Sequence, residues 1–386
     1  MRERILAEGP LSFRDVMHAA LYHPSYGYYT NLLGFGAQGD FVTSPSTHPA
    51  FGFLVARQAV DVWDALGRPR PFRILELGGG DGALAASLLS ALSSQPDRPD
   101  VHYAIQEPSP ALCRAQQSRL GANHVVVWNP APSEQYHLVV ANEVADALPV
   151  QRVAVRNGQL HELRVTLAPD GALTWIEAED VPPEVRAYFA RLKLQPPEGA
   201  IADVPTGLET WVPSVAARLV RGLALILDYG YTAEELFSDR RKQGTLLTYY
   251  RHTLGSDPLV RLGRQDISAH VDFSTVALLA RERGLHVAGV TSQRALLRNL
   301  GAPQVAQTLR SPADRDAFQS LSDPDGLGRL GALFLTRGLP GYEPVGLQGR
   351  DDWPPPGRVP SLPANPRDDQ FLELWREAFP VSEEDA

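Results

Sequence analysis

A run of glycines between two acids is the first feature of the sequence that could support chemistry. Residues 76–82 read Glu-Leu-Gly-Gly-Gly-Asp-Gly; an apolar run at 73–77 leads into them, and apolar residues at helical spacing follow at 83–92. Glycines let the backbone turn sharply and approach a flat ligand closely. The pattern, with Gly78, Gly80 and Gly82, therefore predicts a cofactor site at the turn, although bare turns after strands also contain such runs.

The acids near this turn help to choose between two cofactors. A dinucleotide brings a pyrophosphate, which prefers backbone N–H groups without a nearby anion. S-adenosylmethionine instead carries a positive sulfonium, so Glu76 and Asp81 favour it. Glu107 ends the next apolar run and can accept both ribose hydroxyls of either cofactor. The spacing Gly78-x-Gly80-x-x-Ala83 also satisfies the dinucleotide fingerprint, so a nicotinamide cofactor stays open.

A second pair of acids follows another apolar run. Residues 137–141 are His-Leu-Val-Val-Ala, and the chain continues Asn142-Glu143-Val-Ala-Asp146. In an open parallel sheet, ligands bind beyond the carboxyl ends of the strands. We expect Glu143 and Asp146 to face that crevice, because a dense polar ending on an apolar strand is costly unless something uses it. The alternative is a solvated or helix-capping pair.

The elements that must position these residues alternate between strand and helix. The expected strands are short apolar runs at 73–77, 101–105, 125–128, 137–141 and 223–227, with 286–290 and 332–336 as a closing hairpin. Helical spacing occupies 83–92, 110–120 and 273–283. This alternation predicts an α/β fold with a mostly parallel sheet covered by helices on both faces.

Segments outside the alternation divide the chain further. We predict an N-terminal cap or lid at 1–65, a core at 66–149 and 209–338, an inserted accessory region at 150–208, a substrate-side loop insertion at 231–271, and a Pro-rich tail with a terminal helix at 339–386.

Composition narrows the function classes. The 386 residues suggest two or three domains, or one large α/β domain with insertions, and a net charge of −9 disfavours a nucleic-acid partner. The single Cys113 excludes an internal disulfide and a Cys-rich metal site, and no His-Glu-x-x-His run occurs, so we expect no metal. Without a signal-like start or 18 consecutive apolar residues, we expect a cytoplasmic protein with no membrane span.

Several ordered motifs together resemble the MidA-like family of class I methyltransferases, the bacterial relatives of the mitochondrial complex I assembly factor that methylates an arginine. The motifs are Ala20–Tyr29, Gly39–Pro45, Phe51-Gly52, Glu76–Gly82, Glu107-Pro-Ser109, Asn142–Pro149, Leu227–Gly230, Gly244–Leu246 and Asp266–Phe273. The resemblance implies a Rossmann-like, seven-stranded sheet with an added region, S-adenosylmethionine as the cofactor, and protein arginine methylation.

Roles for individual residues follow as expectations from this resemblance and from the chemistry of a guanidinium, which stays protonated and needs acids to hold it. Glu143 and Asp146 are the expected clamp. Asp228 and His270 are secondary catalytic candidates, although a structural role is equally expected for His270. Asn142 joins the cofactor-binding set.

A lid over the cofactor is expected from the segment that holds Asp40, Phe41 and Ser44. A plain structural turn is the alternative for these three residues.

The acids also suggest the partner: a basic, arginine-bearing segment of another protein, with a complex I type subunit as the candidate. Two other function classes stay open, a non-catalytic assembly chaperone that retains the fold and an NAD-dependent oxidoreductase. The sequence does not decide the methylated protein, mono- versus dimethylation, the role of the tail, or whether the chain forms a homodimer.

Overall fold

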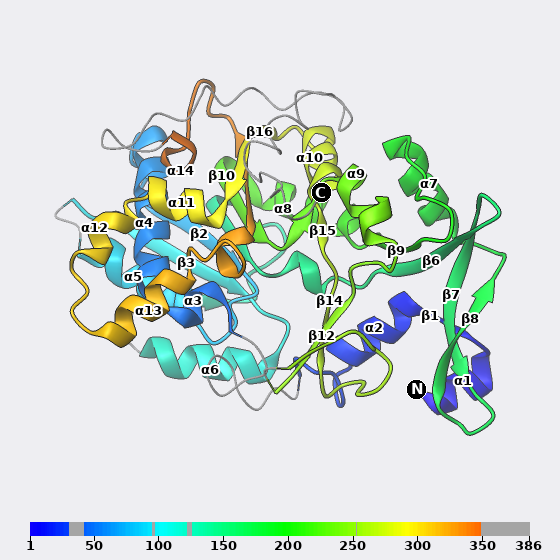
Figure 1. The fold of residues 1–386 in the computed structure, drawn as a ribbon. Helices are drawn as coiled ribbons and strands as arrows, with labels where there is room; N and C mark the ends of the chain where they lie inside the picture. The colour runs from blue at the N-terminus through cyan, green and yellow to red at the C-terminus, as the bar shows by residue number, and fades with distance from the viewer. Residues whose placement is uncertain (31–41, 95–96, 122–125, 252, 349–386) are drawn as a thin grey trace.

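The computed structural model describes residues 1–30, 42–94, 97–121, 126–251 and 253–348. Asp40, Phe41 and the expected terminal helix lie outside the described residues. Two β-sheets, each with its own helices, form two halves of the molecule, and short strands lie between them (Figure 1).

The larger half is built on a seven-stranded sheet. Its strands run in the order β16 (His286–Ser292), β17 (Gly331–Arg337), β10 (Leu219–Asp228), β5 (Tyr136–Asn142), β2 (Phe72–Leu77), β3 (Val101–Gln106) and β4 (Val126–Trp128). The five strands from β10 to β4 pair in parallel, whereas β17 is antiparallel to both of its neighbours. The predicted seven-stranded, mostly parallel sheet and its closing hairpin are therefore present.

Apolar side chains cover both faces of this sheet because successive residues of a strand point to opposite sides. On β5, Leu138 and Val140 join the cluster beneath one set of helices, whereas Val139 and Ala141 join the cluster on the other face. The first face is covered by α4 (Ala50–Ala65), α5 (Ala83–Ser93) and α11 (Gln293–Asn299). The second is covered by α8 (Leu208–Arg218) and α10 (Phe273–Glu282). Near-continuous apolar runs are what such doubly covered strands require.

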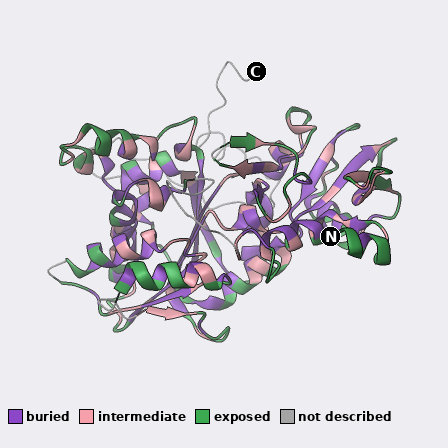
Figure 2. Cartoon of the chain, turned by 90° about the horizontal axis from the view of Figure 1, so that it is seen from below, coloured by how far each residue is buried: buried purple, intermediate pink, exposed green. Residues whose placement is uncertain are grey.

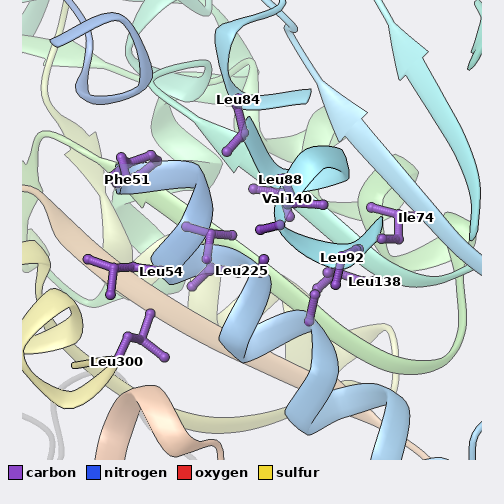
Figure 3. Close-up of a cluster of buried hydrophobic side chains, with 14 of the residues drawn as sticks. Phe51, Leu54, Ile74, Leu84, Leu88, Leu92, Leu138, Val140, Leu225 and Leu300 are labelled. Carbon is purple, nitrogen blue, oxygen red and sulfur yellow. The ribbon is translucent and has the colours of Figure 1, made fainter. Parts of the chain in front are cut away.

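Helix α4 lies within 1–65, the segment expected as a cap, yet it packs on the large sheet. Phe51 and Leu54 of α4 meet Leu88 of α5 and Leu225 of β10 in one buried cluster (Figure 3). Gly52 allows the two helices to approach, because a Cβ there would lie 1.9 Å from the Ser87 hydroxyl. This helix is thus part of the core of the larger half.

The smaller half is built on an antiparallel sheet. In it, a short strand from the start of the chain pairs with a strand that lies much later in the sequence. Its order is β1 (Leu11–Ser12), β7 (Gln159–Leu167), β6 (Gln151–Arg156) and β9 (Ile201–Val204), and β8 (Leu173–Ala178) pairs with β7. Helices α1 (Arg2–Glu8) and α2 (Phe13–Tyr22) pack beside one apolar cluster, and α7 (Pro183–Leu192) and α9 (Ala233–Leu236) contribute to the other. Figure 2 shows buried strands within both halves and exposed residues on the outer helices.

Short elements connect the two halves. Strand β11 (Gly230–Tyr231) pairs with β15 (Val271–Asp272), and β12 (Leu247–Tyr250) pairs with β13 (Thr253–Gly255) and β14 (Asp266–Ser268). The remaining helices are α3 (Ser44–Thr47), α6 (Pro110–Leu120), α12 (Ala302–Ala306), α13 (Pro312–Ser320), α14 (Val345–Gln348) and the 3-10 turns η3 (Ala145–Ala147), η4 (Asp239–Arg241) and η5 (Leu327–Arg329). The irregular interval 231–271 of the sequence therefore contains short paired strands.

Within the described residues, no helix combines the length and apolarity needed to cross a bilayer.

Candidate functional site

A cavity of about 1830 Å³ opens at the carboxyl ends of the parallel strands. It is lined by the ends of β2, β3 and β5, by the segments that follow β10 and β11, and by residues of the N-terminal segment. This is the edge at which open parallel sheets bind ligands. Most of the expected site residues line it, and they are Glu76, Gly78, Gly80, Asp81, Glu107, Asn142, Glu143, Asp146 and His270.

The glycine turn has a conformation that side chains disfavour. Gly78, Gly80 and Gly82 have φ angles of 64°, 52° and 84°, in the left-handed region. A Cβ on Gly78 would lie 2.8 Å from Val144, and one on Gly79 would lie 2.7 Å from Ile105. The turn therefore packs tightly between neighbouring strand ends and leads into α5, which has Gly82 as its N-cap.

The two acids beside the glycines have partners of their own. Glu76 is buried and accepts a hydrogen bond of 2.7 Å from the Tyr103 hydroxyl, and burial raises its pKa to about 8. Asp81 forms an ion pair of 2.6 Å with Arg119 and accepts a bond from the Ala83 N–H. One acid is thus neutral near pH 7 and the other is already paired. The sequence analysis expected free negative charge at this turn to favour S-adenosylmethionine over a dinucleotide. The structure shows no such free charge on these two acids, so they do not explain the choice of cofactor.

Glu107 lies at the end of β3 with its carboxylate held in place. Its Oε1 accepts from the Ser109 N–H at 2.9 Å, and its Oε2 accepts from Gln116 Nε2 at 3.3 Å. Burial raises the pKa of this carboxyl to about 7. Each oxygen keeps accepting capacity toward the cavity, as recognition of paired hydroxyl groups requires.

The turn after β5 places its acid in an unusual backbone conformation. Glu143 has a φ of 53°, which is strained for a residue with a Cβ. Its N–H donates to the Leu227 carbonyl at 2.8 Å, and its Oε1 accepts from the Ser44 N–H at 3.1 Å and from Asn142 Nδ2 at 2.9 Å. Burial raises the pKa of Glu143 to about 7. Hydrogen bonds therefore hold both the backbone N–H and the side-chain carboxylate of Glu143 in place.

Asp228, a secondary catalytic candidate from the sequence, holds this turn from beneath. It is fully buried, and one of its oxygens accepts from the N–H groups of Val144, Ala145 and Asp146 at 3.1, 2.8 and 3.3 Å. The other oxygen accepts from the Tyr229 N–H at 2.8 Å. Asp228 does not line the cavity. The geometry makes it a positioning residue for the turn that carries Glu143 and Asp146.

A third acid, which the sequence analysis did not assign to the site, joins the cavity. Asp266 at the start of β14 lines it beside Asp146, and its carboxylate accepts a bond of 2.8 Å from the Tyr29 hydroxyl. Burial, followed by the charges of Asp228, Asp266 and Glu143, raises the pKa of Asp146 well above its ordinary value. The three cavity acids Glu143, Asp146 and Asp266 are called the acid cluster below.

The N-terminal segment closes one side of this cluster. The Tyr22 hydroxyl donates to the Ala147 carbonyl at 2.9 Å, and the Tyr29 carbonyl accepts from the Ser109 hydroxyl at 2.7 Å. The two tyrosine rings stack with centroids 5.5 Å apart. Ser44 is buried and contacts both Glu143 and Gln293, so its segment touches the turn that carries the acid cluster, and the lid stays a prediction.

His270 lines the same cavity, where it contacts Tyr231. Its Nδ1 is buried without a hydrogen-bond partner, and its ring meets the Tyr231 ring at 5.1 Å. Burial, helped by Arg241 and Arg329, lowers its pKa to about 4. This histidine is therefore neutral in the working range of most enzymes and does not act there as a cation.

The residues at the strand ends fit S-adenosylmethionine by their chemistry. The Asn142 side-chain oxygen is buried and has no hydrogen-bond partner, so it can accept from the amino group of the cofactor. Glu107 can accept from the ribose hydroxyls, and the glycine turn leaves its backbone open to the cavity. No group of three or more His, Cys, Asp or Glu residues in the described ranges is arranged to hold a metal ion.

Comparisons with known proteins agree with this geometry. Residues 54–291 match a protein family described as "Putative S-adenosyl-L-methionine-dependent methyltransferase". The Drosophila melanogaster protein named Protein arginine methyltransferase NDUFAF7 homolog, mitochondrial, is 30% identical, with 90% of this chain and 87% of the relative covered. The Homo sapiens protein named Protein arginine methyltransferase NDUFAF7, mitochondrial, is 26% identical, with coverages of 77% and 71%.

A solved structure extends the likeness to three dimensions. The crystal structure of a Burkholderia thailandensis protein bound to S-adenosyl-homocysteine superimposes with a TM-score of 0.83 at 32% identity, covering 91% of this chain and 94% of that one. These matches support S-adenosylmethionine over the nicotinamide alternative as the cofactor, and methyl transfer as the reaction. The chain belongs to this family of S-adenosyl-L-methionine-dependent methyltransferases, the MidA-like family that its motifs resemble.

Proposed function

We propose that this methyltransferase modifies an arginine guanidinium of a partner protein. The observation that carries the proposal is the acid cluster at the cavity beside the strand ends, because three carboxyl groups suit a cationic, hydrogen-bond-donating acceptor. The names of the fly and human relatives support the same chemistry. From the motif resemblance we extend the proposal to a subunit of a complex I type respiratory enzyme, modified in the cytoplasm.

The protein residues have two tasks in this reaction. When bound, the cofactor supplies a methyl group that its positive sulfur has already activated. Glu143 and Asp146 orient the guanidinium by accepting hydrogen bonds, and one carboxylate accepts the proton that the attacking nitrogen loses. Burial raises the pKa of both acids and so favours their protonated forms, and a cation nearby opposes this effect. The site is therefore poised to exchange a proton when the acceptor arrives.

The test uses the whole protein and extracts of cells that lack its gene. Labelled methyl groups from S-adenosylmethionine should appear as methylarginine in one or a few proteins, which intact-mass comparison of respiratory subunits identifies. Asp146→Asn should reduce the transfer about 100-fold or more, since general acid–base groups contribute on that scale. Calorimetry should show unchanged cofactor affinity.

Glu143→Gln should also lower transfer, with some effect on cofactor binding because Glu143 contacts Asn142. The exposed Glu177→Gln is the matched control on the smaller half. Methyl label on another residue type would refute the arginine assignment. Full activity of both site variants would refute the clamp. Cofactor binding without any transfer would favour the chaperone alternative.

A further inference from the structure

A set of arginines occupies the outer rim of the cavity, opposite in charge to the acid cluster. Five line the cavity, and they are Arg240, Arg241, Arg294, Arg298 and Arg329. They come from the η4 region, α11 and η5, and all except Arg241 are exposed. We call these five residues the arginine rim. The acids that line the cavity near them are Glu235 and Asp325.

Two of these segments, the η4 region and η5, contact the same aromatic ring. The guanidinium of Arg241 lies 3.6 Å from the centroid of the Tyr231 ring, and Arg329 donates to the Tyr231 hydroxyl at 3.1 Å. His270 also contacts this ring and lines the cavity, and its Nδ1 is buried without a hydrogen-bond partner. Specific contacts therefore hold part of the arginine rim in place, and the neighbouring histidine has a buried nitrogen without a hydrogen-bond partner.

Among the residues that the structure describes, three of the five rim arginines have no carboxylate as an ion-pair partner. Arg241 forms an ion pair with Glu235 at 3.1 Å. Across the described ranges, Arg240, Arg294 and Arg329 form no ion pair with a carboxylate. Guanidinium groups left without an anion at a cavity mouth attract carboxylates and repel other cations.

We propose that the arginine rim binds acidic side chains of the substrate protein that lie near the methylated arginine. The inference rests on the proposed function and specifies its substrate class. A wholly basic segment would meet repulsion at the rim before its arginine reached the acid cluster. A segment that combines one arginine with neighbouring Asp or Glu matches both charges of the cavity.

The experiment must distinguish a carboxylate of the substrate protein from a carboxylate of the cofactor. The amino-acid part of S-adenosylmethionine also carries a carboxylate, and a rim arginine could bind it. If so, removing rim arginines would weaken cofactor binding and would leave the preference among substrates unchanged. The two assignments therefore predict opposite results in two binding measurements.

The experiment uses fluorescent 15-residue peptides with a central arginine flanked by four Glu, four Gln or four Lys. With the intact, cofactor-loaded enzyme in low salt, we expect the Glu peptide to bind at least ~10-fold tighter than the Gln peptide, and the Lys peptide weakest, as unscreened charge pairing requires. The double variant Arg294→Gln/Arg329→Gln should lose most of this preference. The double variant Arg98→Gln/Arg310→Gln, which changes the same charge at exposed positions outside the cavity lining, should keep it.

The outcomes separate the inference from the proposed function. Equal binding of the three peptides, no measurable binding, or a preference that survives the rim variant would overturn the rim assignment. Loss of S-adenosylmethionine affinity in the rim variant with an unchanged peptide preference would assign the rim to the cofactor instead. Equal arginine methylation of all peptides would refute the rim and keep the function. Selective binding of the Glu peptide without any methyl transfer to arginine would keep the rim assignment and refute the proposed function.

Discussion

Replacing Glu76 by Gln should make the protein less sensitive to alkaline pH. The side chain is 3% exposed and hydrogen-bonded to Tyr103, and burial raises its pKa from 4.5 to about 8. Between these values the folded protein keeps a proton that the unfolded chain releases. Unfolding then liberates a proton, so this group destabilises the fold progressively as pH rises through that window.

The size of the change in stability follows from the one proton that unfolding releases. A difference of one bound proton changes the free energy of unfolding by about 1.4 kcal/mol per pH unit. Relative to Glu76→Gln, wild-type stability should therefore fall by about 2–3 kcal/mol between pH 5.5 and 7.5. Glutamine keeps a carbonyl oxygen that can accept the Tyr103 hydrogen bond, so the comparison mainly isolates titration.

Urea unfolding of both proteins without cofactor at pH 5.5, 6.5 and 7.5 measures the difference. The substitution Glu3→Gln, at an exposed position of α1, is the matched control. If the stability gap between wild type and Glu76→Gln stays within about 0.5 kcal/mol across this range, the buried carboxyl does not hold its proton and the reasoning is wrong.

Three further results are expected. Asp228→Asn should lower the free energy of unfolding by about 2–3 kcal/mol in urea titrations and slow methyl transfer, because an amide cannot accept all four N–H bonds of the carboxylate; unchanged stability and rate would contradict this. Gly222→Ala should cost about 3 kcal/mol, because its Cβ would lie 1.9 Å from the His137 carbonyl oxygen at a φ of 140°; a melting temperature equal to wild type would exclude that clash. The kcat/KM for methyl transfer should rise with pH up to about 7, since the deprotonated carboxylate of Glu143 holds a guanidinium cation more strongly than the protonated acid does, and a flat profile would exclude this acid as the titrating group.

The sequence predicts the large sheet well because burial on both faces leaves a clear apolar signal. Every expected strand is present in the described residues, and the edges differ by a few positions. Strand β10 shows why edges are harder: it starts at Leu219, before the expected 223, with an irregular register around Gly222. The interval 231–271 was less predictable, because strands of two to four residues have no measurable periodicity.

The site was predictable where residues lie close in sequence and less so where the fold brings them together. Glu143 and Asp146 follow one strand, and strand ends in parallel sheets point to one edge. Asp266 joins them only through pairing of β14 with β12, which no local pattern reveals. Asp228 ends a strand as catalytic acids do, but the sequence cannot say whether such a carboxyl faces a ligand or a neighbouring backbone turn.

The smaller sheet has a consequence for synthesis on the ribosome. Leu11 pairs with Val165, so the first helices have no strand to join until about 150 further residues have emerged. At translation rates of about 5–20 residues per second, these apolar helix faces wait for roughly 8–30 s. During that time they are natural targets for a chaperone at the exit tunnel, and slower translation would lengthen their exposure.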